Sequence, residues 1–207
     1  MRLNTSYKSS VSVQIIKIAK FAVALGISMI LIAVTTGKGL QNEIQKKTVA
    51  FNGHLVVAPF ENGESQISVI PMMSEPAVLE KLKNEQGIVH VQSVALKGGL
   101  LKSGGQFEGV VMKGVTQDYS WEQLKNFLVS GNFPNIGNKS SNEILLSQSI
   151  ANRLSINVGD QVSAYFQNSQ NQQLPNIRRF KVVGLFLSGF PDFDENLFYI
   201  NQNRCQR

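Results

Sequence analysis

The chain has 207 residues, with 20 basic and 14 acidic side chains and a formal net charge of +6. The first 42 residues carry five basic residues and no acid, whereas the remaining 165 carry 15 basic and 14 acidic residues. A positive charge confined to the flanks of an apolar segment is typical of membrane topology and anionic lipid rather than of a nucleic-acid interface. The single cysteine, Cys205, excludes an internal disulfide, so the fold depends on packing.

The most apolar segment runs from Phe21 to Val34 and reads FAVALGISMILIAV. With its uncharged neighbours it gives roughly 20 helical residues, about enough to cross a ~30 Å hydrocarbon core. Four basic residues precede it and one, Lys38, follows closely, so the positive-inside bias predicts a cytoplasmic N-terminus. A cleaved signal peptide is the alternative, but the basic region of about 20 residues before the span and the lack of a clear cleavage site favour a retained anchor.

Helical sequence is predicted on both sides of the span. Residues 8–18 (KSSVSVQIIKI) fit either an amphipathic interfacial helix or an extension of the membrane helix, and both interpretations stay open. Beyond the span, Leu40, Ile44 and Phe51 recur at spacings of four and seven residues. This pattern predicts that the membrane helix continues outward as a stalk and stops at residues 52–53.

The outer region begins with strand and helix signals. HLVVAP, from residue 54, predicts a strand, and SEPAVLEKLKNEQG, residues 74–87, predicts a helix with a serine cap and a glycine stop. Two β-rich stretches follow at 88–102 and 106–115, and the SGG between them predicts a hairpin.

The second half of the outer region mixes short helices with strands. Residues 118–131 predict a short helix ending at a glycine, NEILLS a strand, and QSIANRL a second helix. GDQVSAYFQ and IRRFKVVGLFLSG predict paired strands across a polar loop, and NLFYI a last strand. Strands interleaved with short helices in this irregular order predict an α+β domain.

Motifs for chemistry are missing. The chain has no phosphate-binding Gly-rich loop and no Gly-x-Ser-x-Gly, and both His54 and His90 alternate with apolar residues as on a sheet face. Residues 192–197 have part of a calcium-loop spacing, but Leu197 stands where that loop needs glycine, which favours a solvated turn. Trp121 fits a packing anchor. We therefore expect no enzyme activity, no cofactor and no metal.

Several blocks carry a resemblance to a known family. They read ISMILIAVTTGKGLQNEIQKKTVAFNGHLVV, FEGVVMKGVTQDYSW, LVSGNFP, NEILLSQSIANRLSINVGDQVSAYF, RRFKVVGLF and FPDFDENL. Together they resemble the N-terminal half of lipoprotein-releasing ABC transporter permeases of the LolC/LolE type, within the MacB/FtsX-like superfamily. The resemblance implies an α+β fold with a transmembrane helix and stalk over residues 1–47. A mixed α/β periplasmic domain of two lobes would follow over 48–207, one lobe around GVVMKGV and the other around NEILLS to VVGLF.

The resemblance also implies a function. A bacterial inner-membrane permease subunit of this kind couples the motion of an ATPase to its periplasmic domain through the stalk. Its expected partners are membrane lipid, an ABC ATPase subunit, a second permease copy or paralogue, and a periplasmic lipoprotein carrier, with no nucleic acid. Such permeases have three further membrane helices, and the chain reaches Arg207 without a second apolar run. We therefore expect a fragment or a truncated gene product.

The same resemblance suggests two sets of contact residues. The outer part of the first membrane helix would hold lipoprotein acyl chains, although packing against other helices or lipid is an open alternative for each residue. The loop 167–178 matches a hook for the carrier by position, with an ordinary exposed hairpin as the alternative. The acyl-chain candidates are Ile30, Val34, Leu40 and Ile44, and the hook candidates are Gln172, Leu174, Pro175, Ile177 and Arg178.

Two other functions stay open. One is a non-transporting, membrane-anchored domain that binds a periplasmic partner. The other is a MacB- or FtsX-type permease with a different client. Further membrane spans encoded in frame would favour a permease over the interaction domain, and neighbouring genes for an ATPase and a carrier would favour lipoproteins as clients.

Overall fold

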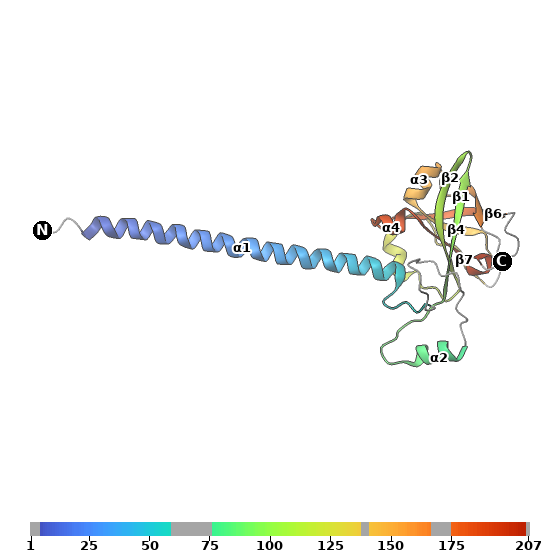
Figure 1. Cartoon of the computed structure of the whole chain (residues 1–207), viewed down its shortest axis with the longest axis horizontal. Coiled ribbons are helices and arrows are strands. Elements are labelled where there is room, and N and C mark those ends of the chain that lie inside the picture. Colours follow the sequence, from blue (N-terminus) through green and yellow to red (C-terminus); the bar gives the residue numbers. More distant parts are fainter. Residues whose placement is uncertain (1–4, 59–75, 138–140, 167–174, 206–207) are drawn as a thin grey trace. The chain divides into compact units, whose positions relative to one another are not determined.

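The computed structural model describes residues 5–58, 76–137, 141–166 and 175–205 (Figure 1). The chain divides into two compact units, residues 1–49 and 50–207.

The first unit is helical. Helix α1, Thr5–Asn52, is continuous, so residues 8–18 extend the membrane helix rather than forming a separate one. Within the described residues, α1 alone is long and apolar enough to cross a membrane, by length and composition. The hydroxyls of Ser28 and Thr35 donate to the carbonyls four residues earlier, at 2.8 and 2.7 Å, so these polar groups are satisfied inside the helix.

Helix α1 ends where the sequence predicts. Gly53 has φ +82°, the left-handed conformation that closes many helices and that glycine adopts without steric cost. The last three helical residues, 50–52, belong to the second unit.

The second unit is built on one sheet that closes on itself. The strand order is β3-β6-β4-β7-β2-β1-β5, and β5 also pairs with β6. Six strands therefore form a closed barrel, and β3 is added to β6 outside it. Closure removes the exposed edges of those six strands. The strands are β1 Val94–Ser103, β2 Gln106–Val115, β3 Leu128–Gly131, β4 Glu143–Ser147, β5 Gln161–Phe166, β6 Asn176–Phe186 and β7 Leu197–Asn201.

Short helices connect these strands. They are α2 Pro76–Asn84, the 3-10 helix η1 Glu122–Phe127, α3 Gln148–Leu154, α4 Pro191–Asp194 and α5 Gln202–Cys205. The start and the end of helix α3 are set by residues at its two termini. The Ser147 hydroxyl caps its start by accepting from the Ser149 amide at 3.1 Å, and Ser155 ends it in the left-handed conformation.

The barrel has an apolar interior and a partly covered outer face. Residues from all six barrel strands, together with Ile150, Ala151 and Leu154 of α3, form one buried cluster. A second cluster lies on the outer face of β2, β4, β6 and β7 and includes Phe51. Both faces of β7 are thus covered, which explains why its five residues, LFYIN, are all buried.

The α+β class is confirmed, and so is the hairpin. Strands β1 and β2 pair without interruption from Val94 with Val115 to Ser103 with Gln106, around a Gly104–Gly105 turn. Strands from both expected lobes, β2 on one side and β4 and β6 on the other, belong to the single closed sheet.

Three local predictions are wrong. Residues 54–58 and 88–93 form no strand. Residues 118–131 contain only a 3-10 helix, and their last four residues are strand β3. Tertiary pairing overrides the helical pattern there, because Leu128–Gly131 pairs with β6. A Cβ at Gly131 would lie 2.2 Å from the Val183 carbonyl oxygen, so only glycine permits this close approach.

Candidate functional site

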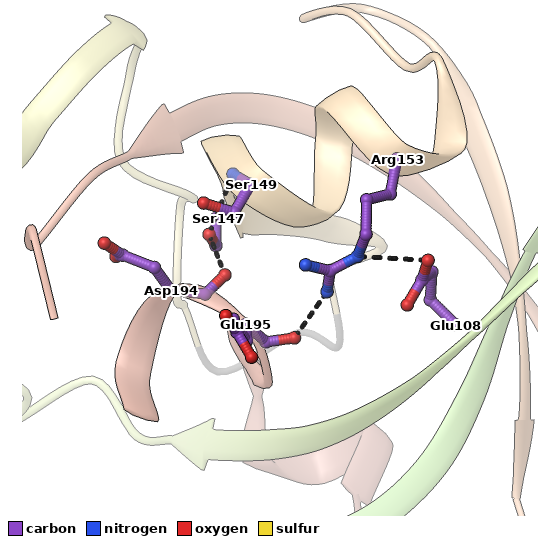
Figure 2. A network of polar contacts seen from close by, with 6 residues as sticks. All are labelled: Glu108, Ser147, Ser149, Arg153, Asp194 and Glu195. Atoms are coloured by element: carbon purple, nitrogen blue, oxygen red, sulfur yellow. Dashed lines mark hydrogen bonds and ion pairs between the residues drawn. The ribbon is translucent and has the colours of Figure 1, made fainter. Parts of the chain in front are cut away.

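A network of polar side chains joins β2, α3 and α4 (Figure 2). Arg153 Nε lies 3.0 Å from Glu108 Oε1, and Arg153 Nη2 donates to the Glu195 carbonyl at 2.7 Å. The Ser147 hydroxyl donates to the Asp194 carbonyl. These contacts connect α3 and α4 to the strands of the barrel. The network therefore stabilises the fold.

The sequence favours a solvated turn at residues 192–197, but Asp194 in this segment is buried. The buried Asp194 carboxylate accepts from the Ser188 and Gly189 amides, both at 2.8 Å, and so stabilises its own loop. No group of three or more histidine, cysteine or acidic side chains that could hold a metal occurs in the part of the chain described.

The end of α1 carries the most specific arrangement in the second unit. Phe51 is 1% exposed, and its ring stacks on Phe193 at a centroid distance of 4.7 Å. The rings of Phe127 and Phe186 lie at 5.3 and 5.5 Å. We call Phe127, Phe186 and Phe193 the aromatic socket. They come from η1, β6 and α4, so the socket exists only in the folded domain.

A buried lysine holds the backbone of the same residue. Lys113 on β2 is 5% exposed, and its ammonium group donates to the Phe51 carbonyl. That carbonyl is among the last four of α1, which have no donor within the helix, and a positive charge suits the negative end of the helix dipole. The Lys113 nitrogen also lies 5.6 and 6.0 Å from the ring centroids of Tyr199 and Tyr119.

Burial shifts the titration of all three groups. It lowers the pKa of Lys113 to about 8 and raises the pKa of Tyr119 to about 12. Burial also raises the pKa of Tyr199 well above 10. At pH 7 the lysine is therefore charged and both phenols are neutral. The sequence-based expectations do not include a role for Lys113. The signal that points to it is a lysine inside the apolar strand VVMKGV.

The acyl-chain candidates Ile30, Val34, Leu40 and Ile44 are all exposed on α1. At about 100° per residue, they fall within one face roughly 120° wide. A shared face allows them to contact the same partner, and their role stays a prediction.

The hook candidates are only partly described. Gln172 and Leu174 lie outside the described residues. Pro175 is exposed and Ile177 is 58% exposed, whereas Arg178 is half-buried and its Nη1 donates to the Arg204 carbonyl at 2.6 Å. This bond fastens Arg178 to α5.

An exposed apolar row continues from Ile177 across the outside of the barrel. Ile177 pairs with Tyr165 on β5, and Tyr165 pairs with Leu100 on β1. Phe107 lies next to Tyr165, with ring centroids 6.3 Å apart, and Lys102 lies over the Phe107 ring at 4.9 Å. Leu100, Phe107 and Ile177 are exposed and Tyr165 is half-buried, so these residues form a partly exposed apolar surface with Lys102 beside it.

The chain belongs to the family described as the MacB-like periplasmic core domain, whose model matches residues 18–207. The resemblance noted from the sequence blocks is thereby confirmed. The lipoprotein-releasing system transmembrane protein LolC of Xylella fastidiosa is 24% identical over 192 residues, covering 89% of this chain and 44% of that protein. LolC of Neisseria meningitidis is 21% identical over 180 residues, covering 84% and 41%. The chain thus spans less than half the length of these relatives.

Two solved structures are similar to the chain. The extracellular domain of the noncanonic ABC-type transporter YknZ from Gram-positive bacteria has a TM-score of 0.45 at 15% identity, covering 63% of this chain and 64% of that one. The periplasmic region of MacB from Actinobacillus actinomycetemcomitans has a TM-score of 0.42 at 18% identity, covering 59% and 52%.

Proposed function

We propose that the chain is a permease component of an ABC transporter that releases lipoproteins from the bacterial inner membrane. The observation that carries the proposal is that one continuous helix contains both the apolar span and Phe51, which is buried in the aromatic socket of the outer domain. A helix of this kind passes displacement from the membrane to the residues that hold its end. The family match over 18–207 and the LolC relatives support the same function.

The chain performs no ATP chemistry in this proposal. It contains no Gly-rich phosphate loop, so a separate ATPase subunit supplies the motion. A second permease copy or paralogue faces α1, and acyl chains lie against Ile30, Val34, Leu40 and Ile44. A periplasmic carrier receives the lipoprotein at the hook loop.

Depletion in the native bacterium tests the function. Lipoproteins bound for the outer membrane are expected to accumulate in the inner-membrane fraction, and the wild-type gene is expected to restore their distribution. An unchanged distribution would contradict lipoprotein release and favour a permease with another client or a non-transporting interaction domain.

The orientation is tested by cysteine labelling. In a Cys205→Ser background, an impermeant thiol reagent added to intact spheroplasts is expected to label Asn135→Cys but not Ser9→Cys. The reason is the basic flank before the span, which the positive-inside bias keeps in the cytoplasm. Labelling only at residue 9 would reverse the proposed topology.

The carrier contact is tested at Ile177. Replacing Ile177 by serine is expected to weaken binding of the purified carrier by more than about 1 kcal/mol, roughly fivefold, because it removes an exposed apolar anchor. Titration calorimetry measures the affinity, and thermal melts are expected to show a stability change within about 0.5 kcal/mol.

Val129→Ser is the matched control, because Val129 is similarly exposed but lies on β3, which pairs with residues 184–186 at the opposite end of β6 from Ile177. The same substitution at Leu174 extends the test to the predicted tip. If the carrier binds the Ile177 and Leu174 variants as tightly as the wild type, the loop is an ordinary hairpin.

A further inference from the structure

We propose that Lys113 is a positioning residue that fastens the last turn of α1 to strand β2. Motion of α1 then enters the barrel at this point. The functional consequence rests on the proposed transporter role, whereas the fastening itself does not.

The bonding of Lys113 is directed at the helix end. Its ammonium group is buried, and no ion pair to an acidic side chain involves it among the residues described. In place of water, the ammonium group contacts the Phe51 carbonyl and the ring faces of Tyr119 and Tyr199. A buried charge is costly unless such groups compensate it, so the bond to the helix end is the main polar contact that keeps Lys113 in place.

Phe51 is held from two separate strands. Its ring contacts Phe186 of β6, while its carbonyl accepts from Lys113 of β2. In the sheet order, β4 and β7 lie between these two strands. One residue at the end of α1 therefore links two non-adjacent strands of the barrel, one through its side chain and the other through its backbone.

Strand β2 is well placed to spread a displacement. It pairs with β1 along its whole length and in parallel with β7 over five residues. Lys113 lies opposite Leu96 on β1 and Tyr199 on β7. A pull on the Lys113 bond therefore reaches three neighbouring strands, whereas the ring contacts of Phe51 act on β6 and the short helices.

Hydrogen exchange of the full chain in lipid nanodiscs tests the fastening. At pH 7, Lys113→Met is expected to accelerate exchange of the amides of residues 48–52 at least tenfold, because the helix end loses its donor and frays. Lys102→Met is the matched control: this lysine also lies over a ring, that of Phe107, and its loss is expected to leave residues 48–52 unchanged.

Val182→Ala separates positioning from general stability. Val182 is buried in the barrel interior, so its truncation lowers the stability of the domain without touching Phe51. It is expected to accelerate exchange in β4 and β7 but not at 48–52. The proposal would be overturned if Lys113→Met leaves hydrogen exchange at residues 48–52 unchanged. It would also be overturned if Val182→Ala accelerates exchange at residues 48–52 as much as Lys113→Met does. If Lys113→Met melts without cooperativity, Lys113→Gln, which shortens the side chain and removes its charge, replaces it under the same criteria.

Lipoprotein fractionation in cells then tests the consequence. Lys113→Met is expected to leave lipoproteins in the inner membrane, while Lys97→Met, which removes a lysine that lies over the Phe166 ring, releases them normally. Normal release by a variant with a frayed helix end would overturn the transmission role. The exchange experiment needs neither ATPase nor lipoprotein, so a failure of the proposed transporter function shows only in the depletion experiment, as an unchanged lipoprotein distribution.

Discussion

Replacing Phe51 by alanine is expected to lower the free energy of unfolding of the outer domain by about 3–5 kcal/mol. The ring is 1% exposed and touches all three rings of the aromatic socket. Its removal loses the transfer free energy of the ring and leaves a cavity between η1, β6 and α4. Because the residue lies at the end of α1, the same change removes the ring contacts that hold the helix end, while the bond from Lys113 to the backbone carbonyl can remain.

Urea denaturation followed by Trp121 fluorescence measures this loss. Trp121 packs against Tyr119 and Phe133 in the same buried cluster, with ring centroids at 4.7 and 5.0 Å, so its emission reports the packing there. Phe107→Ala is the control, because that ring is 54% exposed and its loss is expected to cost about 1 kcal/mol or less. A comparable small loss for Phe51→Ala would show that the socket does not hold the ring.

The stability of the outer domain is expected to rise by about 2–3 kcal/mol between pH 8 and pH 10. Burial lowers the pKa of Lys113 from 10.5 to about 8 in the folded domain. Between these values the unfolded chain binds a proton that the folded chain has lost, so raising the pH favours folding. The groups that face the ammonium are the Phe51 carbonyl and the rings of Tyr119 and Tyr199.

Above about pH 10 the two tyrosines act in the opposite direction. Burial raises the pKa of each, so the unfolded chain ionises first and stability falls as the pH rises. Stability is therefore expected to be greatest near pH 10. Urea midpoints at half-unit pH intervals measure the curve. In Lys113→Met, the free energy of unfolding is expected not to rise between pH 8 and pH 10 but still to fall above pH 10. In Lys102→Met, both the rise and the fall are expected to remain. A wild-type curve that is flat from pH 8 to 10 would contradict the burial of a charged Lys113.

Elements with a local cause could be predicted from the sequence. Helix α1, its stop at Gly53, the β1–β2 hairpin around Gly104 and the capped helix α3 each depend on residues a few positions apart. Trp121 was correctly predicted to be a packing anchor. Strand β3 could not be predicted in this way, because its four residues are extended only through pairing with β6, more than 50 positions later in the chain.

The sequence by itself determined the membrane span, the uneven charge, the α+β class and the family, since hydrophobic periodicity, turn residues and motif blocks are properties of neighbouring residues. Only the tertiary structure decided that the sheet closes through β5 and β6 and that the end of α1 is held by Lys113, 62 positions away from Phe51. Such contacts depend on which distant strands pair and on which buried polar groups lose their contact with water. A local sequence pattern predicts neither the strand pairing nor the buried groups, because both follow from the packing of the whole domain.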